Sequence, residues 1–154
     1  MKENQNLFRD LQEDFRKMKK NLLVAQSGGP TAAINATLAG VIKQAIKEEQ
    51  IDQVYGACYG IQGVLEQKFV NLTEKVDTEE KLEKLKRTPA AALGSCRFKL
   101  NDIKEDDSQY QEIVDILHKM NIGYFVYIGG NDSMDTVAKL SAYCKEKGVE
   151  DIKV

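Results

Sequence analysis

Residues 129–133, Gly-Gly-Asn-Asp-Ser, have the types and spacing best suited to chemistry on a phosphate group. Glycine allows a backbone to turn sharply and to approach a ligand closely, and the free N–H groups at the start of a helix attract anions. The preceding residues 124–128 form an unbroken run of aromatic and β-branched side chains, which is typical of a strand buried on both faces. A strand, a glycine turn and a polar helix start therefore predict a phosphate or phosphate–metal site.

A similar glycine turn lies near the start of the chain, where Gly28 and Gly29 follow a short apolar strand at 22–25. Apolar residues between positions 34 and 46 then recur at helical spacing. Thr31 is predicted to cap this helix, which would leave the glycine turn facing the positive end of the helix dipole. Taken alone, a pair of glycines is weak evidence for a ligand, because glycine also serves turns that bind nothing.

Arg97 is a third candidate. It follows a segment at 88–96 that is built mostly of small residues, so the backbone there can approach another surface closely. An arginine can hold a phosphate through its planar guanidinium group. The alternative interpretation is a surface arginine without a ligand.

The remaining segments must supply the elements that position these residues. A second strand is predicted over 54–58, with a glycine turn at 59–63. Two possible capping boxes, Asp77-x-x-Glu80 and Ser108-x-x-Gln111, predict helices that end before Pro89 and near Asn121.

The end of the chain is predicted to hold one more helix and the beginning of a strand. The helix starts at Asn131 and runs to about Lys147, with Gly148 just past its end. The strand begins within 151–154. Alternating strands and helices indicate an α/β domain over 21–154, a Rossmann-like three-layer fold with a parallel sheet and helices on both faces. Ligands of such folds bind at the carboxyl ends of the strands.

Residues 1–20 are predicted to form a charged N-terminal helical extension. Leu7, Leu11, Phe15 and Met18 recur at helical spacing, so we expect this helix to dock on the domain or on a partner subunit.

The composition is that of a soluble globular protein of 154 residues, 42% hydrophobic and 30% charged. A formal net charge of −2 argues against nucleic acid or an anionic membrane as a partner. No apolar run approaches the roughly 20 residues that a membrane-spanning helix needs. The three cysteines, Cys58, Cys96 and Cys144, are widely spaced and fit free thiols in a reducing cytoplasm. The single histidine, His118, lies beside apolar positions and fits a packing or surface role better than a catalytic one.

Four short motifs together resemble the phosphofructokinase family. In chain order they are Ser-Gly-Gly-Pro at 27–30 followed by Asn35-Ala36, Tyr-Gly-Ile-Gln-Gly at 59–63, Leu-Gly-Ser-x-Arg-Phe at 93–98, and Ile-Gly-Gly-Asn-Asp-Ser at 128–133. The resemblance covers about residues 21–154 and is strongest to the N-terminal part of a pyrophosphate-dependent 6-phosphofructokinase.

The resemblance implies a phosphotransferase of glycolysis. Such an enzyme transfers a phosphoryl group from pyrophosphate to the 1-hydroxyl of D-fructose 6-phosphate, giving fructose 1,6-bisphosphate, with Mg²⁺ as cofactor. It also implies a cytoplasmic homo-oligomer. The resemblance places Mg²⁺ at Asn131, where ATP-dependent members have aspartate. The donor-binding residues that it implies are Gly28, Gly29, Arg97, Phe98, Gly130, Asp132 and Ser133.

Asp132 is the residue expected to select the donor. It stands where ATP-dependent members have glycine, and a carboxylate there would meet the α-phosphate of ATP. Such a like-charge contact costs several kcal/mol in rough terms in a partly dry site, whereas pyrophosphate has no α-phosphate to be repelled.

The family's general base lies in a Thr-x-Asp-Asn-Asp stretch that does not occur in these 154 residues. We therefore expect the chain to be a fragment that is inactive alone. Two alternatives are an ATP-dependent 6-phosphofructokinase and a non-catalytic regulatory module that binds phosphate. A dinucleotide-binding domain is not favoured, because no Gly-x-Gly-x-x-Gly follows the first strand.

Overall fold

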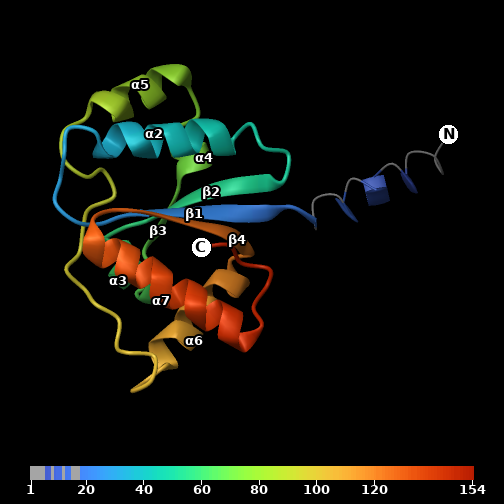
Figure 1. The fold of residues 1–154 in the computed structure, drawn as a ribbon. Helices are drawn as coiled ribbons and strands as arrows, with labels where there is room; N and C mark the ends of the chain where they lie inside the picture. Colours follow the sequence, from blue (N-terminus) through green and yellow to red (C-terminus); the bar gives the residue numbers. More distant parts are fainter. Residues whose placement is uncertain (1–5, 8, 12, 15–17) are drawn as a thin grey trace.

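The computed structural model describes residues 6, 7, 9–11, 13, 14 and 18–154. Four strands form one sheet in the order β3-β2-β1-β4 (Figure 1). Strand β1 (Lys20–Gln26) lies between β2 (Ile51–Ala57) and β4 (Ile122–Ile128) and is parallel to both. The short edge strand β3 (Phe69–Asn71) is antiparallel to β2. The sheet is therefore mixed, whereas the sequence predicted a parallel one. The connection at 58–68 is shorter than the dozen or so residues that a parallel crossover needs.

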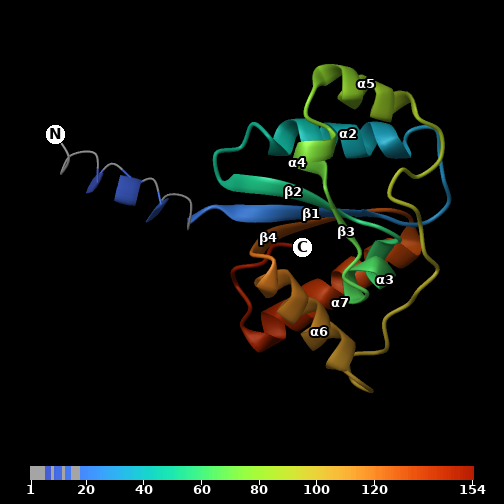
Figure 2. The same ribbon diagram turned by 180° about the vertical axis from the view of Figure 1, so that it is seen from behind.

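Helices cover both faces of the sheet, which confirms the three-layer α/β prediction (Figures 1 and 2). One face carries α2 (Ile34–Ala45), α4 (Leu72–Lys75) and α5 (Glu79–Arg87). The other carries α3 (Gly60–Leu65), α6 (Ser108–Lys119) and α7 (Asn131–Lys147). The glycine turn predicted at 59–63 is confined to its start: Tyr59 lies in a turn with a φ of +66°, and residues 60–63 already belong to α3.

Strand β4 shows why its sequence is an unbroken apolar run. Phe125 and Tyr127 are buried in the core beneath α6 and α7, whereas Tyr124, Val126 and Ile128 pack against the core on the α2 side. Because successive side chains of a strand point to opposite faces, a strand with a core on each side needs apolar residues throughout.

The helix ends differ from the predicted caps at three places. Ala33, not Thr31, occupies the N-cap position of α2, and it makes no side-chain cap bond. Thr78, not Asp77, caps α5, because its hydroxyl accepts from the Lys81 N–H at 3.2 Å.

At α6 the N-cap position is Asp107, and Ser108 is already helical. A capping residue must be the last one outside the helix, and residue types alone do not decide which neighbour that is. The predicted bounds of α7 are confirmed, and Gly148 ends it with a φ of +70°.

The described residues before β1 extend away from the layered body, whereas the C-terminal end packs against it (Figures 1 and 2). The described residues between 6 and 18 are helical, and Leu7, Leu11 and Met18 are exposed rather than docked on the domain (Figures 1 and 2). Phe15 lies outside the described residues. At the other end Lys153 forms a parallel bridge to Tyr124, consistent with the predicted beginning of a strand. In the described part of the chain, the helices all fall short of the length and apolar character that crossing a membrane requires.

Candidate functional site

The two glycine turns lie side by side at one edge of the sheet. Strands β1 and β4 are adjacent and parallel, so their carboxyl ends coincide, and the Ser27 N–H donates to the Ile128 carbonyl at 2.8 Å. Gly28 has a φ of +80°, and a Cβ there would lie 3.2 Å from the backbone nitrogen of Gly130. Both the backbone conformation and the close approach of the second turn therefore require glycine at position 28.

The second turn is closed by Ser133, the third residue of α7. Its side chain is buried beneath the turn, and a Cβ on Gly129 would lie only 2.0 Å from the Ser133 hydroxyl oxygen. The N-cap residue of α7 is Gly130, which has no side chain to cap the helix. It therefore leaves the backbone N–H groups in the first turn of α7 uncapped. A long helix that starts in this way at the edge of a sheet is suited to binding an anion.

A buried polar network ties the segment after α5 to the first turn. The Gln26 amide accepts from the Leu93 N–H at 2.9 Å and donates to the Asn35 carbonyl oxygen at 3.1 Å. The Asn35 amide nitrogen donates to the carbonyls of Thr88 (2.8 Å) and Ala90 (2.6 Å). Gln26 and Asn35 are both fully buried, so these bonds hold residues 88–93 against the start of α2.

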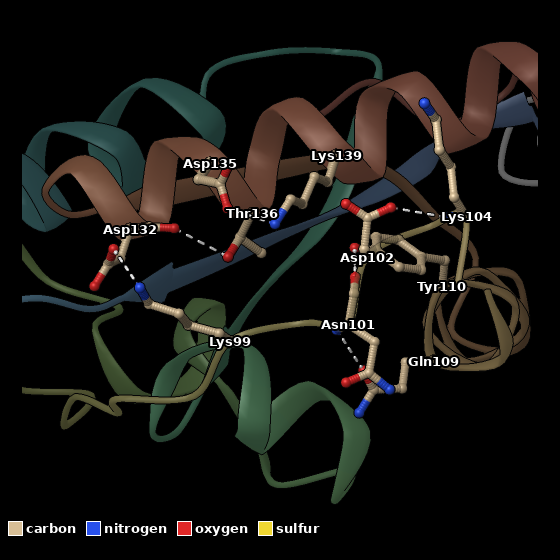
Figure 3. Close-up of polar contacts among 10 residues, drawn as sticks. All are labelled: Lys99, Asn101, Asp102, Lys104, Gln109, Tyr110, Asp132, Asp135, Thr136 and Lys139. Atoms are coloured by element: carbon tan, nitrogen blue, oxygen red, sulfur yellow. Dashed lines mark hydrogen bonds and ion pairs between the residues drawn. The ribbon is translucent and has the colours of Figure 1, made fainter. Parts of the chain in front are cut away.

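The segment then crosses the carboxyl edge of the sheet between two further anchors. On one side, the Ser27 hydroxyl donates to the Cys96 carbonyl at 3.1 Å and the Ser95 hydroxyl donates to the Gly28 carbonyl at 2.7 Å. On the other, Leu100 is buried and the Tyr110 hydroxyl donates to the Asn101 carbonyl at 2.5 Å (Figure 3). Residues 97–99 are thus held next to the glycine turns without belonging to a helix or strand.

These elements enclose a cleft with a volume of 1020 Å³. Six residues that the resemblance implied for donor binding line it together: Gly28, Gly29, Arg97, Phe98, Asp132 and Ser133. Gly130 and Asn131 are exposed and are not among the lining residues. The roles of all eight residues remain predictions.

The cleft also contains a cation that the sequence analysis did not single out. The Lys99 ammonium lies 3.4 Å from the Asp132 carboxylate, and the two side chains are 73% and 77% exposed (Figure 3). The sequence feature that could have pointed to Lys99 is its place two positions after Arg97, as a second basic residue of the same segment.

Tyr127 and Cys96 also line the cleft. The Tyr127 hydroxyl accepts from the Ile61 N–H at 3.1 Å, and burial raises the pKa of Tyr127. Burial also acts to raise the pKa of the Cys96 thiol, but hydrogen bonds with the backbone N–H groups of Gln62 and Phe98 and with the hydroxyls of Tyr127 and Ser27 together more than offset it. The pKa of Cys96 therefore lies below its ordinary value. All three cysteines are free thiols.

The resemblance implied Mg²⁺ as a cofactor, but the described residues do not form a magnesium site by themselves. No group of three or more His, Cys, Asp and Glu side chains suited to a metal occurs among them. Asp132 is the one carboxylate among the residues that line the cleft, and it is paired with Lys99. Asn131, the position implied for Mg²⁺, does not line the cleft.

Comparison with known proteins agrees with this architecture. Residues 21–154 match the phosphofructokinase family, and the chain belongs to that family. It is 44% identical over 123 residues to the pyrophosphate--fructose 6-phosphate 1-phosphotransferase of Rhodospirillum rubrum, covering 80% of this chain and 29% of the relative. It is 40% identical over 129 residues to the enzyme of the same name from Halomonas elongata, covering 83% of this chain and 30% of the relative.

A crystal structure of the pyrophosphate-dependent phosphofructokinase from Nitrosospira multiformis has a similar fold. The TM-score is 0.78 at 37% identity, over 88% of this chain and 32% of the other. The chain thus spans less than one third of the length of these relatives.

Proposed function

We propose that the cleft binds pyrophosphate as a phosphoryl donor. The chain is then the donor-binding part of a pyrophosphate-dependent 6-phosphofructokinase, which phosphorylates the 1-hydroxyl of D-fructose 6-phosphate. The observation that carries the proposal is the meeting of Asp132 with Gly28, Gly29 and Arg97 in one cleft. Backbone amides and a guanidinium group suit a short anionic ligand, and the carboxylate limits how far that ligand can extend.

The exposure of Asp132 sets the size of its effect on ATP. Two unit charges about 4 Å apart interact with about 1 kcal/mol in water and about 4 kcal/mol at an effective dielectric constant of 20. Because the side chain is 77% exposed, the lower value applies to the open cleft. A bound donor displaces water from the cleft, which raises the interaction energy towards about 4 kcal/mol. The charge of Asp132 alone therefore disfavours ATP by between roughly fivefold and nearly a thousandfold.

The rest of the reaction is assigned to parts of the enzyme beyond these residues. Phosphoryl transfer requires a positioned donor, neutralisation of its charge and an oriented acceptor hydroxyl. The described residues supply groups only for the first of these and for part of the second. We expect the 154-residue chain alone to show no turnover. The family resemblance and the substrates favour a cytoplasmic homo-oligomer that uses Mg²⁺.

Titration of the isotope-labelled chain tests the donor site directly. Inorganic pyrophosphate should shift the backbone amide signals of Gly29, Arg97 and Ser133, whereas ATP at the same concentration should not. Asp132→Gly should increase the affinity for ATP by at least about fivefold. Asp135→Gly is the matched control, because Asp135 is an acidic residue on the same helix outside the cleft lining, and it should leave ATP binding unchanged.

The longer protein that contains this chain supplies the activity test. With fructose 6-phosphate and Mg²⁺ it should form fructose 1,6-bisphosphate from pyrophosphate and not from ATP. Turnover with ATP alone would contradict the role of Asp132. Pyrophosphate binding without turnover would favour a non-catalytic phosphate-binding module.

A further inference from the structure

We infer that Lys99 is a positioning residue for donor selection, which holds the Asp132 carboxylate at the cleft and offsets its charge. This inference rests on the proposed function. The Asp132 carboxylate, which disfavours ATP, also repels pyrophosphate, because pyrophosphate is itself strongly anionic. The site therefore needs a cation that offsets the negative charge of Asp132.

The ion pair between Lys99 and Asp132 is exposed, so its contribution to the stability of the fold is small. Its atoms are 3.4 Å apart and both side chains are mostly exposed. Exposed pairs of this kind contribute little to stability, because water screens the attraction and two long side chains lose freedom. What distinguishes this pair is its place, since both residues line the cleft that holds Arg97 and the glycine turns.

The backbone of Lys99 is held where the side chain can reach Asp132. The next residue, Leu100, is buried, and the Asn101 carbonyl accepts from the Tyr110 hydroxyl (Figure 3). On the preceding side, the Cys96 carbonyl is bound by the Ser27 hydroxyl. The side chain of Lys99 thus comes from an irregular segment fixed at both ends, and Asp132 comes from the first turn of α7.

Charge balance gives the functional consequence. The charged residues among those that line the cleft are Arg97, Lys99 and Asp132, and their formal charges sum to +1. Without Lys99 that charge falls to zero, and the Asp132 carboxylate faces the donor without compensation. Lys99 acts through Asp132, so removing both charges together returns the formal charge of the cleft to +1.

Four variants of the chain test the inference by titration with inorganic pyrophosphate. Lys99→Gln should weaken binding by about tenfold, because it leaves the carboxylate uncompensated. Lys99→Arg should restore binding to within about threefold of wild type, because the charge is kept. Lys104→Gln is the matched control: an exposed lysine on the same irregular segment but outside the cleft lining, which should change nothing. The double variant Lys99→Gln/Asp132→Asn should bind within about threefold of wild type.

The outcomes separate this inference from the function on which it rests. If the folded wild-type chain binds no pyrophosphate, the proposed donor site is wrong and the assignment of Lys99 falls with it. If the wild type binds but Lys99→Gln binds equally well, only the assignment of Lys99 is wrong. A double variant as weak as Lys99→Gln also overturns it, since Lys99 would then act on the donor independently of Asp132.

Discussion

Asn35 offers the sharpest test of how the fold builds the cleft. Its fully buried side chain makes four hydrogen bonds: it donates to the carbonyls of Thr88 and Ala90, and it accepts from the Ala92 N–H and the Gln26 amide. Asn35→Ala removes all four. Each such bond contributes about 0.5–1.5 kcal/mol net, so four bonds amount to about 2–6 kcal/mol. We expect the free energy of unfolding to fall by about 2–4 kcal/mol, in the lower part of that range.

Two features of the structure limit the loss of unfolding free energy in Asn35→Ala, because the groups that lose Asn35 as a partner are not all left buried and unpaired. Thr88, Ala90 and Ala92 are exposed residues, so water can reach part of their backbone. The Gln26 amide nitrogen keeps a bond to the Ile34 carbonyl at 3.3 Å. Asn35→Asp should be at least as harmful as the alanine variant, because a carboxylate cannot donate to the two carbonyls that the amide nitrogen now binds.

Urea unfolding of the 154-residue chain, followed by circular dichroism, measures the effect. The midpoint should fall while the slope stays the same. Thr37→Ala is the control on the same helix, since its exposed hydroxyl donates only to the Ala33 carbonyl, and its change should stay within about 0.5 kcal/mol. An Asn35→Ala variant as stable as Thr37→Ala would refute the role of the network. Pyrophosphate affinity should fall with stability, because residues 88–93 lead directly to Arg97.

Two further predictions address the turn and the thiol. Gly129→Ala should reduce stability by about 1–3 kcal/mol and weaken pyrophosphate binding, because the added Cβ would lie 2.0 Å from the Ser133 hydroxyl oxygen. Gly40→Ala in α2, where a Cβ meets no atom within 4 Å, should instead stabilise by about 0.5–1 kcal/mol, and thermal unfolding compares the two. Iodoacetamide should alkylate Cys96 faster than Cys144, because the thiolate reacts and the pKa is lowered at Cys96 but raised by burial at Cys144. Mass spectrometry should show that pyrophosphate slows the reaction at Cys96, and equal rates at both thiols would contradict this reasoning.

The parts of the fold that were predictable follow from local patterns. The apolar run at 124–128 indicated a strand that is buried on both faces, and β4 does pack against a core on each face of the sheet. The helix from Asn131 to Lys147 was predicted with its terminating glycine. In both cases the pattern of side chains reports the burial of the element that carries it.

Other features depended on contacts that no local pattern contains. Strand β3 is only three residues long, too short for an alternation of side chains to be recognised. The N-cap positions of α2, α5 and α6 each lie one or two residues from the predicted ones. Only at α5 does the N-cap side chain make a cap bond, so at α2 and α6 the helix start is not set by a capping side chain that the sequence could reveal.

The α/β class, the two glycine turns and the candidate residues could be predicted from local patterns, because strand and helix periodicity and the need for glycine are properties of neighbouring residues. Which of these residues share a cleft became known from the three-dimensional arrangement. Strands β1 and β4 are far apart in the chain yet adjacent in the sheet, and the path of residues 94–107 brings Lys99 to Asp132. Such pairings depend on strand order and on the anchoring of an irregular segment, which are set by long-range packing and hydrogen bonds.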